Sequence, residues 1–98
     1  MIVLIVDQLG QIVATPAALD ALAAADTSPS TLLQRHASGD WGDLDAHDHA
    51  ANVQALRDGS RLLSAYIVAE GVKVWIITEA ADEDGYRATT TLLLPEEY

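Results

Sequence analysis

Six side chains able to bind a metal or transfer protons fall between residues 40 and 49. They are the carboxylates and imidazoles of Asp40, Asp43, Asp45, His47, Asp48 and His49. Such groups bind divalent cations, and on a helix Asp45 and His49 would lie on one face at a spacing of i, i+4. The cluster therefore suits a small metal-dependent hydrolase, although it contains no His-Glu-x-x-His motif. We favour a structural interpretation, in which the acids cap a helix and His49 packs against a sheet or forms a hydrogen bond.

Serine and histidine side chains raise the separate question of nucleophilic catalysis. The candidates are Ser38, Ser60 and Ser64 as nucleophiles, with His36, His47 or His49 as the base. No nucleophile-elbow pattern surrounds these serines. We therefore expect no catalytic residues and no cofactor, and we predict that the protein is not an enzyme.

Two arginines near Asn52 also have two interpretations. Arg57 and Arg61 are close together in the sequence and could hold a substrate anion. Because acids outnumber bases so strongly, we prefer ion pairs with Asp40 or Asp43 within the chain.

Trp41 lies between Gly39 and Gly42 and is flanked by aspartates. As an exposed side chain it would be an aromatic anchor for a partner. As a buried side chain it would close the edge of a small core while the glycines let the chain turn around it. We favour the buried position.

The charge balance is unusual, with 15 acidic and 5 basic residues and a formal net charge of −10. This charge argues against direct binding to nucleic acid, whose phosphates would be repelled. It suits binding to a basic surface, including one that normally holds DNA or RNA, although net charge also keeps a small domain soluble. The predicted contacts with such a partner are Asp40, Asp43, Asp45, Asp48, Asp82, Glu83 and Asp84.

The elements that must position these groups are those of one α+β domain over residues 1–98. Three short helices are predicted by helix-start signals such as Thr15-Pro16 and by apolar spacing. A three-stranded antiparallel β-meander follows, in which the pattern of apolar residues changes to a period of two. The helices are expected at 16–25, 30–37 and 45–57, and the strands at 61–70, 72–79 and 87–94.

The strand at 72–79 is expected to be central, because both of its alternating sets of side chains contain apolar residues. Residues 1–6 and 11–14 can add an N-terminal strand or a hairpin around Leu9-Gly10. The chain has no cysteine, which excludes disulfides and thiolate metal sites. The apolar run at 1–6 is too short to span a membrane and has no basic leader. We expect a cytoplasmic protein that is a monomer or a weak homodimer.

Several sequence motifs together resemble a known group of proteins. They are Ser-Gly-Asp-Trp-Gly-Asp at 38–43, Asn52, Ala55-Leu56, Gly-Ser-Arg-Leu-Leu-Ser-Ala-Tyr at 59–66, Val-Trp-Ile-Ile-Thr-Glu-Ala at 74–80 and Leu-Leu-Leu-Pro-Glu-Glu-Tyr at 92–98, with a weaker match over 9–16. The chain is similar to small uncharacterised bacterial proteins carried on plasmids, integrative elements and prophages. That family typically has a short Asp-Arg-Ser link where this chain has the longer acidic segment 81–86.

The mobile-element setting implied by the resemblance, joined to the charge, suggests an anti-CRISPR protein. The first hypothesis is therefore an inhibitor that imitates DNA and blocks the DNA-binding surface of a type I Cas complex. The alternatives are the metal-dependent hydrolase above and a mobile-element regulator that binds another host protein.

Overall fold

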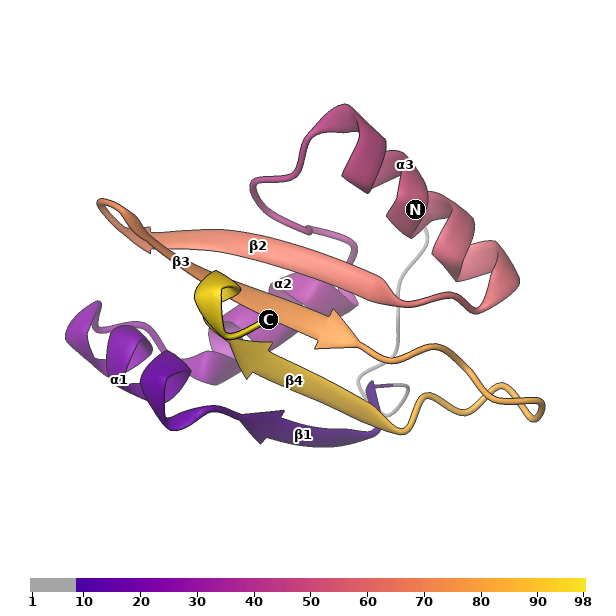
Figure 1. Ribbon diagram of the computed structural model, residues 1–98, viewed down its shortest axis with the longest axis horizontal. Coiled ribbons are helices and arrows are strands. Elements are labelled where there is room, and N and C mark those ends of the chain that lie inside the picture. The colour runs from indigo at the N-terminus through magenta and orange to yellow at the C-terminus, as the bar shows by residue number, and fades with distance from the viewer. Residues whose placement is uncertain (1–8) are drawn as a thin grey trace.

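The computed structural model describes residues 9–98 and has an α+β fold in which helices pack on a four-stranded sheet (Figure 1). The described elements, in chain order, are β1 (Gln11–Ala14), α1 (Pro16–Ala24), α2 (Pro29–Ala37), α3 (Ala46–Asp58), β2 (Leu62–Ala69), β3 (Val72–Thr78), β4 (Thr89–Leu93) and the 3₁₀ turn η2 (Pro95–Glu97). The α+β class and the three predicted helices are confirmed. The predicted strand at 1–6 lies outside the described residues.

The sheet is mixed and not the three-stranded antiparallel meander that we expected. Its strand order is β1-β4-β3-β2, with β1 parallel to β4 and the other neighbours antiparallel. Gly10 makes the parallel pairing possible, because a Cβ atom there would lie 2.2 Å from the carbonyl oxygen of Arg87. Its φ of +68° is also one that glycine adopts without strain. β3 lies between β4 and β2 and is the internal strand that its residue pattern predicts.

Each helix begins at a capping side chain that the sequence supplies. Thr15 accepts a hydrogen bond from the amide of Ala18, and Ser28 accepts one from Ser30. In both cases a proline occupies the first helical position. Asp45 caps α3 by accepting from the amide of Asp48 at 2.8 Å. These caps satisfy amide groups that have no partner inside the helix.

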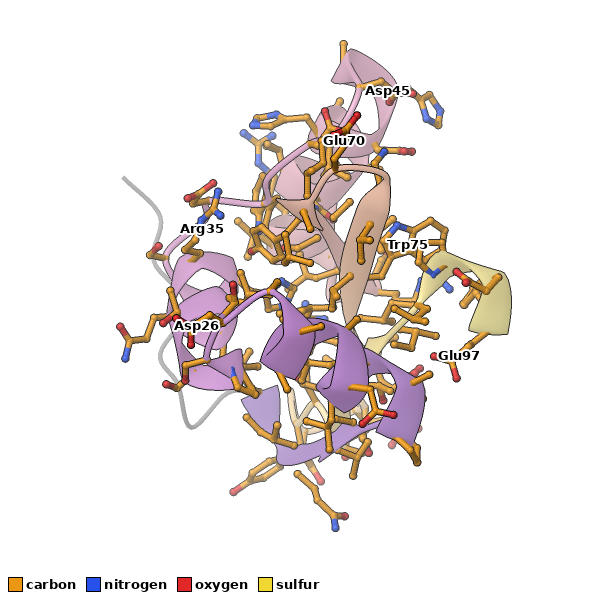
Figure 2. All side chains as sticks on the ribbon, turned by 90° about the vertical axis from the view of Figure 1, so that its left-hand side faces the viewer. Asp26, Arg35, Asp45, Glu70, Trp75 and Glu97 are labelled. Atoms are coloured by element: carbon orange, nitrogen blue, oxygen red, sulfur yellow. The ribbon has the colours of Figure 1, made fainter. Side chains whose placement is uncertain are left out.

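The main core lies between one face of the sheet and the helices α1 and α2. Its buried members are Ala18, Leu22, Leu32, Tyr66, Val74, Ile76 and Leu92. Figure 2 shows Arg35 of α2 and Trp75 of β3 on opposite sides of the sheet. The second face, on which Trp75 lies, is therefore not the one that α1 and α2 cover.

α3 lies beside the outer edge of β2 (Figure 1). The side-chain amide of Asn52 donates to the carbonyl of Leu63 at 2.6 Å and accepts from its amide at 3.0 Å. Asn52 thus pairs with β2 as a neighbouring strand would, and satisfies the backbone of this edge. Within residues 9–98 no helix is both long and apolar enough to cross a membrane.

Candidate functional site

Three of the predicted contact residues meet at the amino end of α3. Asp43, Asp45 and Asp48 line a hollow of about 380 Å³ whose other lining includes Lys73 and Trp75. Asp43 reaches this place because the chain passes around the edge of β2. The carbonyl of Trp41 accepts from the amide of Ala65 at 3.0 Å, and the amide of Asp43 donates to the carbonyl of Ala65 at 2.6 Å. Asp45, labelled in Figure 2, is the residue that caps the amino end of α3.

Asp40 and Asp43 are each paired with a cation of the same chain. Asp40 accepts from Nε of Arg35 at 2.6 Å, and this bond holds the pKa of Asp40 below its ordinary value. Asp43 lies 3.0 Å from Nζ of Lys73. The predicted pairing of these aspartates with Arg57 or Arg61 is wrong, because the cations that the fold brings near come from α2 and β3.

The arginines near Asn52 do not form an anion site. The guanidinium of Arg61 lies over the ring of Tyr98, 5.1 Å from its centroid, and donates to the Tyr98 hydroxyl. Asn52 uses its amide on the backbone of β2, and the side chain of Arg57 is exposed. These groups therefore do not converge on a common point.

The ligand atoms of Asp45, His47 and Asp48 lie within 4.8 Å of one another. His49 does not join them and packs edge-on against Trp41, with ring centroids 5.1 Å apart. Our prediction that His49 packs against a sheet or forms a hydrogen bond is wrong, because its side chain is exposed and contacts the ring of Trp41 instead. Asp45 also caps α3, and an acidic group in the first turn stabilises the helix without a metal.

Asp82, Glu83 and Asp84 lie at the other end of α3. The amide of Ala81, just before them, donates to the carbonyl of Gly59 at the carboxyl end of the helix. A helix of 13 residues is about 20 Å long. Figure 1 shows this loop at the end of the molecule, after β3. Six of the seven predicted contacts therefore form two groups and not one surface, and Asp40 lies apart from both, paired with Arg35.

Asp82 has a structural function within its own loop. Its Oδ1 accepts from the amides of Asp84 and Tyr86, both at 2.9 Å. The carboxylate thereby holds the turn between β3 and β4. Glu83 and Asp84 are exposed beside it.

Trp41 is buried, with 6% of its surface exposed, as we expected from the glycines around it. It contacts His49 and closes the space between the edge of β2 and α3. Trp41 is therefore part of the fold and not an exposed anchor for a partner.

A fully buried hydrogen-bond chain joins α2 to three strands. It runs from Ser64 to Nδ1 of His36 at 2.5 Å, from Nε2 of His36 to Thr78 at 2.8 Å, from Thr78 to Thr90 at 2.8 Å, and from Thr90 to the carbonyl of Leu9 at 2.6 Å. We call these residues the His36 chain.

The direction of every bond in the His36 chain follows from its last member. Thr90 has one hydroxyl hydrogen and gives it to the Leu9 carbonyl, so it must accept from Thr78. Thr78 has then used its own hydrogen and must accept from Nε2–H of His36. Nδ1 is consequently the acceptor for the Ser64 hydroxyl, and His36 is held as the neutral Nε2–H tautomer.

The His36 chain brings together a serine and a histidine that we considered as nucleophile and base. Both are fully buried, so no substrate reaches the Ser64 hydroxyl. Burial lowers the pKa of His36 to about 4, and the positive charge of Arg87 adds to this effect. The pair is structural. Sequence reasoning missed Thr78 and Thr90, although both lie at the inward positions of their strands, where a hydroxyl indicates a buried polar contact.

Comparisons with protein-family models, with curated proteins and with solved structures found no match for this chain. The functional argument therefore depends on the residues and on their arrangement.

Proposed function

We propose that this protein acts by binding, and that the acidic group at the amino end of α3 contacts a cationic surface of a nucleic-acid-binding partner. Bound there, its carboxylates would pair with lysines and arginines that otherwise hold phosphates, and so exclude the nucleic acid. The observation that carries the proposal is the state of Asp45 and Asp48. Within residues 9–98 neither forms an ion pair with lysine or arginine, and both line an open hollow.

The partner we propose is a type I CRISPR surveillance complex in the host cytoplasm. This identity is supported by the resemblance to proteins of mobile elements and by the net charge of −10. The second candidate partner is a different host protein bound by a regulator of the same mobile element.

The test is binding to the purified Cas complex, measured at low and at moderate salt. We expect affinity to fall steeply as salt rises, because exposed charges are screened over about 10 Å at 0.1 M salt. The double variant Asp45→Asn, Asp48→Asn should weaken binding by about tenfold at low salt. Asparagine is as good a helix cap as aspartate, so α3 should keep its cap, and the lost charges should cost only about 0.3–1 kcal/mol each through the helix dipole.

The matched control neutralises two carboxylates at the other end of α3. Glu83→Gln with Asp84→Asn changes the net charge equally and should alter affinity less than about twofold if contact is made at the amino end. Equal losses in the two variants would show that only total charge matters. Absence of any complex with the Cas proteins would refute that partner, and a pull-down from host lysate would then test the second candidate.

A metal-dependent hydrolase is the alternative function, and the arrangement of Asp45, His47 and Asp48 favours it over other enzymes. Mn²⁺ and Zn²⁺ should then raise the unfolding temperature, because a ligand that binds only the folded state stabilises it. The shift should disappear in His47→Ala and persist in His49→Ala, since only His47 belongs to the group. A shift absent from the unaltered protein would refute the hydrolase.

A further inference from the structure

We propose that the face of the β2–β3 hairpin turned away from α1 and α2 binds an extended, basic partner segment that carries an apolar side chain two residues from an arginine or lysine. We call this surface the outer face and define it by Ala65, Ile67, Lys73 and Trp75. The inference rests on the proposed function and specifies the chemistry of the partner at the same acidic group.

The outer face is incompletely covered by the described part of the chain. α1 and α2 pack on the opposite face, and on this face the ring of Trp75 lies 5.8 Å from that of Tyr98. Ile67 is 60% exposed, although it lies on a strand whose other residues are mostly buried. An exposed isoleucine beside a half-buried tryptophan is typical of a surface that contacts a partner.

Two hollows of different character adjoin on this surface and share Lys73. The first is the acidic hollow of Asp43, Asp45 and Asp48, floored by Trp75. The second has a volume of about 300 Å³ and is lined mainly by apolar groups, with one carboxylate. Its lining is Ile67, Gly71, Val72, Lys73, Pro95 and Glu96.

The spacing of the hollows sets the spacing in the partner. Ala65 pairs with Trp75 under the first hollow, and Ile67 pairs with Lys73 under the second. These pairs lie two residues apart along the strands, which is about 7 Å. In an extended segment, side chains at i and i+2 point to the same side and have the same separation. One such segment would place a basic group among the aspartates and an apolar group on Ile67.

The charges favour a basic occupant. Asp43, Asp45, Asp48 and Glu96 supply four carboxylates to the two hollows, against the single ammonium of Lys73. The Lys73–Asp43 pair has both side chains about half exposed, at 44% and 54%. Such a pair is weak, and a partner arginine can share or replace it. A second copy of this chain is disfavoured, because each copy has a net charge of −10.

The experiment compares two synthetic peptides by calorimetry on the full chain. One repeats arginine, serine, leucine and serine, and the other has serine at each leucine, so that both have the same charge. We expect the leucine peptide to bind at least about tenfold more tightly, as burial of one leucine allows. Nuclear magnetic resonance should show the shifts of Ile67 and Trp75 changing with the leucine peptide.

Matched variants separate the two hollows. Ile67→Ser should remove most of the preference for leucine, whereas Leu19→Ser should keep it. Leu19 is 45% exposed on α1 and is therefore a comparable apolar surface residue on the other side of the sheet. Asp45→Asn with Asp48→Asn should weaken both peptides alike.

Equal affinity for the two peptides, or shifts confined to the 82–84 loop, would overturn the inference. Sedimentation that shows a dimer broken by Ile67→Ser would also overturn it, because the occupant would then be a second copy. A Cas complex that binds with the predicted dependence on Asp45 and Asp48 while the peptides bind equally would leave the proposed function standing without this inference. If the leucine peptide is preferred but no Cas complex binds the protein, this inference stands and the proposed Cas partner is refuted.

Discussion

At the scale of single residues, the arrangement of His36 decides how a polar side chain can lie in the core. A buried polar group without partners destabilises a protein, but both ring nitrogens of His36 are satisfied. The arrangement works for the neutral ring only, because a protonated imidazole would donate from both nitrogens and Ser64 would have to turn its hydroxyl hydrogen away. The residue therefore makes stability depend on pH.

We predict that the free energy of unfolding falls by about 3 kcal/mol between about pH 7 and about pH 4 through His36. The folded pKa of about 4 lies below the ordinary 6.5, so the unfolded chain binds more protons in this window. The contribution is complete above about pH 6.5 and is lost as the pH falls towards 4. Urea unfolding at several pH values measures it.

His36→Gln is the control for this prediction, since it removes the titration and keeps a polar side chain. Carboxylates with lowered pKa values, such as Asp40 and Glu97, also make the protein less stable as the pH falls. They are present in both proteins, so their contribution is the same in both. The difference between the two pH profiles therefore isolates the histidine. Parallel profiles would contradict a neutral buried His36.

At the scale of elements, the edge of β2 is protected by a turn that only glycine allows. Gly42 has a φ of +75°, and a Cβ atom there would lie 2.1 Å from the carbonyl oxygen of Ala65. This contact lets the chain pass from the α2 side of the sheet, where Asp40 meets Arg35, to the outer face, where Asp43 meets Lys73. The element that closes the sheet edge thus also carries Asp43 to the acidic hollow.

We predict that Gly42→Ala destabilises the protein by several kcal/mol more than Gly71→Ala. Both glycines have nearly the same positive φ, so alanine loses about 1–2 kcal/mol to backbone strain at either position. Only Gly42 adds a clash with backbone, because a Cβ atom at Gly71 meets nothing within 4 Å. Thermal and urea unfolding of the two variants give the comparison, and equal losses would show that the edge contact is unimportant.

Arg87 also stabilises the arrangement of the elements, because it joins three of them from a buried position. Its guanidinium donates to the carbonyls of Ser60 at 2.7 Å, Glu79 at 3.1 Å and Ala55 at 3.2 Å. It thereby joins the carboxyl end of α3 to the start of β2 and the end of β3. A cation here also opposes the negative end of the helix dipole.

We predict that Arg87→Met lowers the free energy of unfolding by about 2–3 kcal/mol, because it leaves carbonyl groups without donors. Arg57→Met is the matched control, since Arg57 is exposed on α3, and it should change stability by less than about 0.5 kcal/mol. Chemical denaturation checks both. Similar effects in the two variants would mean that net charge, and not the three hydrogen bonds, sets the result.

At the scale of the whole molecule, the excess of acids opposes folding while it suits a cationic partner. The net charge of −10 is spread over a body with a radius of gyration of 12.8 Å. Self-repulsion at this charge destabilises the compact state. The exposed pairs Arg35–Asp40 and Lys73–Asp43 offset only a small part of it.

We therefore predict that salt stabilises the free protein. Raising the salt from about 20 mM to about 300 mM should screen the repulsion and add about 1 kcal/mol, which is about 4–8 °C in unfolding temperature for a domain of this size. Calorimetry with sodium chloride measures the change. A falling unfolding temperature would mean that the internal ion pairs outweigh the repulsion.

The sequence by itself determined the elements whose signals are local. Thr15-Pro16 and Ser28-Pro29 start α1 and α2, Gly59 ends α3, and apolar residues in both alternating sets make β3 an internal strand. A cap or a proline acts on the turn that contains it, so these features need no knowledge of distant residues. The buried position of Trp41 also followed from the glycines beside it.

Only the tertiary structure decided which distant groups meet. Nothing near Gln11–Ala14 specifies that β1 pairs in parallel with β4, because that pairing joins residues far apart in the sequence. Composition likewise cannot select Arg35 and Lys73 as the partners of Asp40 and Asp43, since all five basic residues are equivalent until the chain folds. The length of α3 separates the acids at its amino end from those of the 82–84 loop. The order of the strands brings Ser64, Thr78 and Thr90 to one buried line with His36.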